Sequence, residues 1–272
     1  MSYHSPQSSK NDSETNSQIL MLGGIFLSGI VVLYLLFNLL VNIIITFIPP
    51  VVEQKLESVI VPVYEQQAVN STQQKTLNQL LNRLERNLPV KQQENEYQVL
   101  YIPKDTVNAI AIPGNKIIIY RGLLAEVESE NELMMVLGHE LGHFANRDHL
   151  RGLGNALMVR VTISYLLGDA NIFQSMIASS IKAISDANYS QKQEKQADKF
   201  GLELLDKTYG QVAGATDFFQ KLSKARTSNY DFLASHPAPA KRVKEIKKLI
   251  KKNNYSTEST TPLPENLQLN RL

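Results

Sequence analysis

The chain has 272 residues, a net charge of +2, 43% hydrophobic residues and 20% charged residues. This length suits one sizeable domain with appendages or two small domains, and neither the charge nor any motif indicates a nucleic-acid partner. Cysteine is absent, which excludes disulfides and thiolate metal sites, so that any metal must bind to His, Asp and Glu.

The first segments of the chain predict a tail and a membrane anchor. Residues 1–18 are polar and rich in Ser and Asn, which is typical of a disordered tail. Residues 19–48 carry no charge, and roughly 20 apolar residues suffice to span a bilayer as a helix. The run is too long for a signal peptide and has no polar face for a core helix, so we expect one transmembrane helix. Lys10 and Lys55 flank it equally, so the positive-inside rule does not orient it.

A linker and a first helix should follow the span. Pro49 and Pro50 end the apolar run, and we assign residues 49–70 to a linker. From residue 71 to 88 the leucines recur at a helical period, which predicts an amphipathic helix that Pro89 ends. These leucines are Leu77, Leu80, Leu81, Leu84 and Leu88.

Three short runs then predict a small sheet. Residues 96–103, 106–114 and 116–122 are rich in Val, Ile and Tyr and are separated by Pro, Gly, Asn and Asp. Gly114 followed by Asn115 suits a tight hairpin turn between the second and third strands. We therefore expect about three strands here.

Helices should form most of the remaining chain. A short one is expected near Leu123 and a longer one from about residue 131 to 146, with others at 190–205 and 217–225. The whole pattern predicts an α+β fold, in which a mostly helical domain over residues 71–254 contains the small sheet.

Two later segments raise the question of membrane contact. Residues 152–185 are apolar, but Arg160 and the pair Gly168-Asp169 interrupt them, which favours two amphipathic helices over a second span. Residues 240–254 predict a helix with one apolar and one lysine-rich face, either solvated or leaning on anionic lipid. Residues 255–272 are polar and are predicted to be a disordered tail.

The most informative motif is the stretch VLGHELGHFANRDH at residues 136–149. His139 and His143 are four apart on a predicted helix and therefore project from one face, where two imidazoles can bind one ion. Glu140 lies about 100° around the helix from His139, so it can reach a metal-bound water without becoming a ligand. This H-E-x-x-H arrangement is typical of zinc hydrolases in which the Glu is the general base.

A catalytic zinc needs a third protein ligand, for which two candidates exist. His149 is six residues beyond His143, but an uninterrupted helix would place it about 240° around, and no glycine turn intervenes. Glu194 is the better candidate, and it shares one face of a later helix with Asp198. Glu194 can bind the ion and Asp198 can accept the free N–H of a bound histidine. Glu203 should point to the opposite side.

Two glycines in the motif predict tight packing. Gly138 and Gly142 each cost about 1 kcal/mol relative to Ala in a helix interior. Their use would be the close approach of another element, or room for a substrate beside the ion.

These residues together resemble a known family. HELGH, with EKQAD about fifty residues later, is similar to the membrane-associated gluzincins that include HtpX-type heat-shock proteases and the CAAX prenyl protease. Further matches are NAIAIPGNKIIIYRGLL from residue 108, FANRDH, and SHPAPAKRV from Ser235. The resemblance covers about residues 70–250 in the same order. It departs where Ile110 replaces a common aromatic residue and Asn115 replaces a glycine.

The resemblance implies one zinc ion per chain on His139, His143 and Glu194. It also implies that Glu140 is the base and proton shuttle, and that Asp198 accepts a hydrogen bond from a zinc-bound histidine. His236 would donate a hydrogen bond to the developing oxyanion, close over the zinc as an inhibitory ligand, or serve only structurally. Substrate would lie extended against the strand at residues 108–113.

The sequence therefore predicts a membrane-anchored zinc endopeptidase with polypeptide substrates and a role in membrane or envelope protein quality control. A zinc-containing chaperone or scaffold without proteolysis is the alternative. A polytopic prenyl-type protease fits less well, since only one span is convincing. We expect a single-pass protein of the cell inner membrane with an extracytoplasmic domain. Substrate identity, regulation and oligomeric state do not follow from the sequence.

Overall fold

The computed structural model describes residues 11–46, 50–154, 181, 184, 188–224 and 231–269. The chain divides into two units, Met1–Phe47 and Ile48–Leu272, which are described separately. Most of the predicted helices at 152–185 lie outside the described residues, although residues 148–154 are helical.

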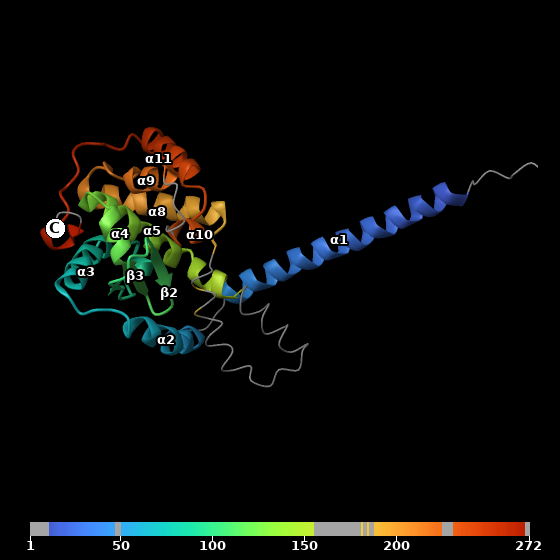
Figure 1. Cartoon of the computed structure of the whole chain (residues 1–272), viewed down its shortest axis with the longest axis horizontal. Helices are drawn as coiled ribbons and strands as arrows, with labels where there is room; N and C mark the ends of the chain where they lie inside the picture. Colours follow the sequence, from blue (N-terminus) through green and yellow to red (C-terminus); the bar gives the residue numbers. More distant parts are fainter. Residues whose placement is uncertain are drawn as a thin grey trace, which may run out of the picture. The chain divides into compact units, whose positions relative to one another are not determined.

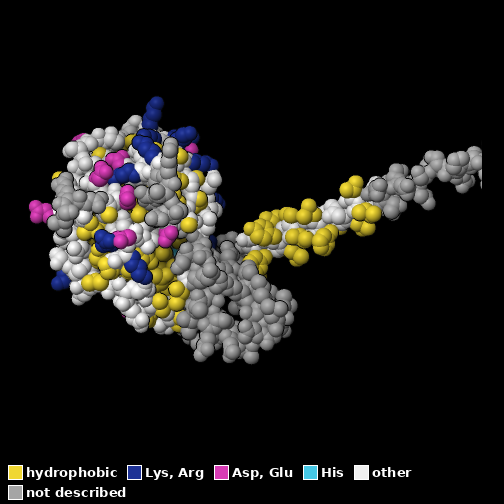
Figure 2. Space-filling model, viewed as in Figure 1, with side chains coloured by type: hydrophobic (Ala, Val, Ile, Leu, Met, Phe, Trp, Pro, Cys, Tyr) yellow, Lys and Arg dark blue, Asp and Glu magenta, His cyan; other side chains and the backbone are white. Residues whose placement is uncertain are grey.

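The described residues of the first unit form one long helix, α1 (Asn11–Thr46), drawn in blue in Figure 1. Within it, Ser17–Leu40 has the length and composition of a membrane span, with a mean hydropathy of 2.6. Figure 2 shows apolar side chains along the described part of this helix. The prediction of a disordered tail is wrong for residues 11–18, because the helix begins at Asn11.

The second unit begins with helix α2 (Pro50–Glu65), which lies where the sequence suggested a linker. In the sequence, its prolines suggested that no helix forms here. However, Pro50 occupies the first helical position, where no backbone N–H is needed, and Pro62 lies in the last turn. Ile60, Val61 and Tyr64 are buried against the sheet, so this segment packs on the domain instead of crossing open solvent.

The sheet has the order β1-β3-β2, formed by Gln98–Ile102, Lys116–Tyr120 and Ala109–Ile112. β1 is parallel and β2 antiparallel to β3, so β2 is an edge strand. Gly114 and Asn115 both have positive φ, at 81° and 55°, which confirms the predicted hairpin turn. Both faces are covered, since alternate residues pack against α2 or against the main helical core, which explains the nearly continuous apolar runs.

Helices pack against the face of this sheet that is opposite to α2 (Figure 1). The central one, α5 (Glu130–Ala145), is capped by Ser129, whose hydroxyl accepts from the Glu132 N–H. Its main partner is α8 (Gln191–Tyr209), which begins with a capping box at Ser190. The other elements are α3 (Thr72–Glu85), η1 (Val90–Gln92), α4 (Arg121–Glu126), α9 (Asp217–Lys224), α10 (Asp231–Ser235), α11 (Pro239–Asn253) and η2 (Glu265–Leu267).

The segment after α11 is not the disordered tail that its polar composition suggested. Ser129 forms a β-bridge with Pro262, and the Thr261 carbonyl accepts from the Glu130 N–H. Leu263 and Leu267 are buried in the core that also contains α3 and α5. These two leucines, separated by polar residues, were too sparse to indicate burial in the sequence.

Removing the Leu267 side chain should therefore destabilise the domain. Leu267→Ala leaves a cavity in a fully buried site, and we expect a loss of about 2–5 kcal/mol in the free energy of unfolding. Urea unfolding followed by circular dichroism measures it, with the exposed neighbour Glu265→Ala as the control. Equal midpoints for both variants would mean that the segment does not pack as described.

Candidate metal centre

Close packing of α5 against α8 creates the site. Gly138 faces Gly201, and Gly142 faces Ala197. A Cβ atom on Gly142 would lie 2.7 Å from the Cα of Ala197, and one on Gly138 would lie 2.9 Å from the Cα of Gly201. The expectation that these glycines permit close approach is confirmed, and the partner is the helix that carries Glu194.

Four buried side chains converge between these helices. His139 and His143 come from α5, Glu194 from α8, and His236 from the segment between α10 and α11. Their ligand atoms lie within 4.8 Å of one another, a group that could hold a metal ion. His139 Nε2 is 3.1 Å from His143 Nε2 and 3.2 Å from His236 Nδ1. Imidazole nitrogens and a carboxylate oxygen are typical ligands of zinc, so the donor set fits the expected ion.

A carboxylate contacts the Nδ1 atom of each α5 histidine, on the side of the ring away from Nε2. Asp198 Oδ1 lies 3.0 Å from His139 Nδ1, and Asp148 Oδ2 lies 3.0 Å from His143 Nδ1. If each Nδ1 donates its proton to the carboxylate, each Nε2 presents a lone pair toward the cluster. Asp148 was missed in the sequence, although it belongs to the FANRDH stretch, which begins in the last turn of α5.

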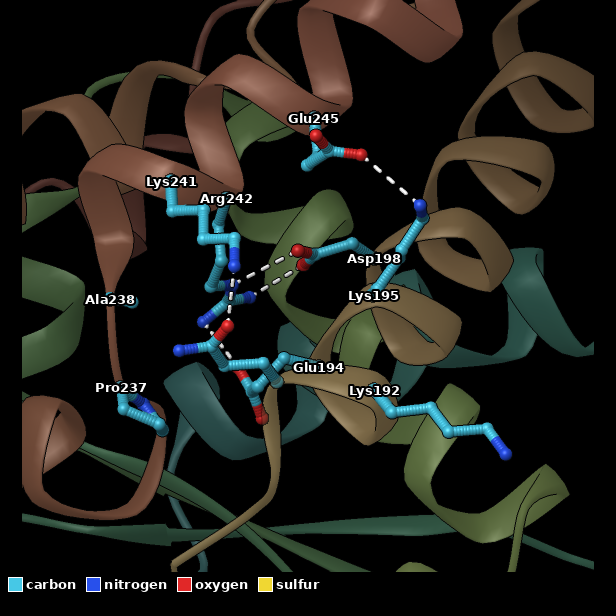
Figure 3. A pocket seen from close by; sticks show the side chains of 10 residues that line it. Lys192, Glu194, Lys195, Asp198, Pro237, Ala238, Lys241, Arg242 and Glu245 are labelled. Atoms are coloured by element: carbon cyan, nitrogen blue, oxygen red, sulfur yellow. Dashed lines mark hydrogen bonds and ion pairs between the residues drawn. The ribbon is translucent and has the colours of Figure 1, made fainter.

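Arg242 of α11 binds the two carboxylates of α8 (Figure 3). Its Nε and Nη2 lie 3.0 and 2.6 Å from the two oxygens of Asp198, and its Nη1 lies 2.8 Å from Glu194 Oε2. These three residues are buried and help to line a pocket of about 330 Å³. Arg242 belongs to the SHPAPAKRV stretch quoted above, but among the neighbouring lysines nothing marked it as a residue of the site.

The surroundings set the charges of the cluster. Burial, aided by Arg242, lowers the pKa of His139 to about 4. Burial also opposes protonation of His143, but hydrogen bonding to Asp148 and Glu194 outweighs it and raises the pKa of this residue to about 9. For Glu194 burial would raise the pKa, yet His236 and Arg242 hold it well below its usual range. Metal binding would therefore find Glu194 charged and would displace a proton from His143.

Two aromatic rings stack on His143 and His236. Tyr189 stacks on His143 with ring centroids 3.9 Å apart, and Phe232 stacks on His236 at 4.2 Å. The Tyr189 N–H donates to the Ser235 carbonyl, which ties the start of α8 to the segment that carries His236. Neither aromatic residue was singled out in the sequence, because a lone Tyr or Phe carries no motif.

Glu140 lies beside the cluster but does not join it. It is fully buried, and within the described residues neither of its carboxylate oxygens has a hydrogen-bond partner. The nearest ionisable contact is His236 Nε2, 3.6 Å from Glu140 Oε1. A buried carboxylate without partners is costly and indicates a functional role.

His149 and Glu203 lie away from the cluster, as expected. His149 Nε2 is 3.7 Å from Glu53 Oε1 of α2, and its ring packs against Phe144. Glu203 pairs with Lys199 on the exposed side of α8.

Comparisons with known proteins agree with this geometry. Residues 71–250 match the profile of Peptidase family M48. The chain is 32% identical to Metalloprotease LoiP of Escherichia coli (strain K12) over 183 residues, 65% of this chain and 71% of LoiP. It is 30% identical over 153 residues to Mitochondrial metalloendopeptidase OMA1 of Arabidopsis thaliana, 54% of this chain and 30% of OMA1. It is also 28% identical over 194 residues to a Protease HtpX homolog of Fusobacterium nucleatum, 55% of this chain and 62% of that protein.

The matched residues hold all four members of the buried His-His-Glu-His group. The family match covers more than half of the chain, and it includes both the α5 motif and the α8 carboxylates. The chain therefore belongs to the peptidase family M48 and is a metallopeptidase.

Proposed function

We propose that the chain is a zinc-dependent endopeptidase that cleaves polypeptides. The observation that carries this proposal is the convergence of His139, His143 and Glu194 beside the carboxylate of Glu140, which has no hydrogen-bond partner among the described residues. One zinc ion on the three ligands would polarise the scissile carbonyl and lower the pKa of the attacking water. Nitrogen and oxygen ligands without sulfur match those of catalytic zinc in hydrolases.

The protein groups would then move the proton. Glu140 accepts the proton of the water as it attacks the peptide carbonyl, and passes it to the leaving amine. Asp198 and Asp148 hold the histidine rings in place during this step. Arg242 keeps the carboxylates of Glu194 and Asp198 charged and oriented.

Chelation tests this proposal directly. We expect the purified full chain in detergent to cleave casein, to lose at least about nine-tenths of this activity with a zinc chelator, and to regain it on adding zinc. Cleavage that is insensitive to the chelator would contradict the metal mechanism. Stoichiometric zinc without any cleavage would favour the chaperone or scaffold alternative.

His236 has two proposed roles, as donor to the oxyanion or as inhibitory fourth ligand. Its position supports either, because Nδ1 is 3.1 Å from Glu194 Oε1 and Nε2 faces Glu140. As a donor, its loss should lower kcat about 10²- to 10³-fold, so we expect that result for His236→Ala in the casein assay. A rise in activity would instead identify His236 as an inhibitory ligand.

The edge strand β2 is the proposed site of substrate binding. Among the residues that the structure describes, β2 pairs only with β3, so its other edge can accept an extended polypeptide by strand addition. Residues 108–113 would supply the backbone groups, and such binding makes few demands on the side chains of the substrate.

We further propose a single-pass protein of the cell inner membrane, with an extracytoplasmic domain that acts in membrane or envelope protein quality control. The candidate span at Ser17–Leu40 supports the anchor. Protease added to spheroplasts should digest the domain, and digestion in inverted vesicles alone would place it on the cytoplasmic side.

A further inference from the structure

The turn that follows α5 places Asp148 behind His143. Asp148 is 1% exposed, its Oδ2 lies 3.0 Å from His143 Nδ1, and its Oδ1 accepts from Gln193 Nε2 at 2.9 Å. The preceding residue, Arg147, has a φ of 56°, a conformation that non-glycine residues rarely adopt. Such a backbone persists when surrounding contacts hold it.

Helix α2 supplies two contacts at this turn, in addition to the ion pair of Arg151 Nη1 with Asp148 Oδ1 at 3.2 Å. Glu53 Oε2 accepts from Arg147 Nη2 at 3.1 Å, while Glu53 Oε1 lies 3.7 Å from His149 Nε2. One carboxylate thus engages the residues on both sides of Asp148. We call these three residues, Glu53, Arg147 and His149, the clasp.

The clasp is partly buried, because His149 lies inside the domain. The side chain of His149 is only 4% exposed, and no hydrogen bond reaches either of its ring nitrogens from the described part of the chain. Its ring packs edge-on against Phe144, with centroids 4.7 Å apart. Proximity of His149, with a contribution from Arg147, lowers the pKa of Glu53, so this carboxylate is charged at neutral pH.

We infer that Glu53 is a positioning residue for the metal centre, acting through the clasp to hold Asp148 against His143. The inference rests on the proposed function, since it assigns His143 to the metal. Residues 47–49 alone separate α2 from α1, the helix with the candidate span. The clasp therefore connects the segment that follows the span with the carboxylate that orients a proposed ligand.

Zinc affinity is the property that distinguishes this role from a purely structural one. A salt bridge at a partly exposed site would affect stability slightly and leave metal binding unchanged. A positioning role instead predicts that Glu53 matters only while Asp148 is present. A double-mutant cycle between the two residues measures that dependence.

The experiment uses the zinc-loaded full chain in detergent and a competing chromophoric chelator. We expect Asp148→Asn to weaken zinc binding about 10- to 100-fold and Glu53→Gln about 3- to 10-fold. The double variant should bind zinc within about twofold of Asp148→Asn alone. Glu65→Gln, an exposed carboxylate on the same helix, should leave the affinity unchanged.

Either of two results would overturn the inference: an affinity of Glu53→Gln within about twofold of the parent, or additive effects in the double variant. Should Glu53→Gln not fold, Arg147→Asn opens the clasp from the other side, because Asn tolerates positive φ. His143→Ala in the same titration separates the two proposals. Unchanged zinc binding by His143→Ala would refute the proposed metal site. If His143→Ala loses zinc binding while Glu53→Gln keeps the parent affinity, only the role of the clasp is refuted.

Discussion

Glu140→Gln is expected to retain zinc and the fold while losing peptide hydrolysis. Glutamine has nearly the same shape as glutamate but cannot accept the proton of the attacking water. General-base catalysis contributes about 10²- to 10⁴-fold, so kcat should fall by at least this range with little change in KM. Casein cleavage and zinc content, measured on the same preparation, check both parts of the prediction.

The structure explains why this substitution should be tolerated. Neither oxygen of Glu140 has a hydrogen-bond partner among the described residues, so the amide breaks no hydrogen bond to them. A matched control is Glu203→Gln on α8, since that carboxylate lies on the exposed side and pairs with Lys199. Full activity of the Glu140 variant would sink the assignment of the base.

Gly142→Ala is expected to weaken both stability and metal binding. The added methyl group would lie 2.7 Å from the Cα and 3.0 Å from the carbonyl oxygen of Ala197, and neither backbone atom can rotate away. The helices must then separate, which moves His143 away from Glu194. We expect a loss of about 1–3 kcal/mol in the free energy of unfolding, together with weaker zinc binding.

Helix propensity alone predicts the opposite change in stability for Gly142→Ala, so the sign of the change distinguishes the two effects. In a helix free of contacts, Gly→Ala should stabilise by about 1 kcal/mol. Gly24→Ala in α1, where an added Cβ meets nothing within 4 Å, is the control for expression and membrane insertion. Urea midpoints and zinc content measure the effect, and a stabilised Gly142→Ala variant would show that α5 and α8 are not in close contact there.

Local patterns predicted the parts of the fold that depend on neighbouring residues. The helical period of the leucines located α3, and the Gly114-Asn115 pair located the hairpin turn. The H-E-x-x-H spacing likewise identified the α5 half of the site, because one helix presents both histidines on one face. In each case the relevant residues are within a few positions of one another.

What the sequence did not predict depends on packing between distant segments. Helix α2 and the segment after α11 gain their order from burial of a few apolar residues, such as Ile60 and Leu267, against the rest of the domain. Arg242 likewise looked like one more cation on a basic helix. Its role follows only from the position of α11 beside α8, which brings the guanidinium onto Asp198 and Glu194.

The zinc content of the purified full chain tests the central claim most directly. Elemental analysis should find one zinc per chain in the parent protein and in Glu140→Gln, and less than about a tenth of that in His139→Ala and in His143→Ala. A parent protein without stoichiometric zinc, or histidine variants that retain it, would contradict the proposed metal centre.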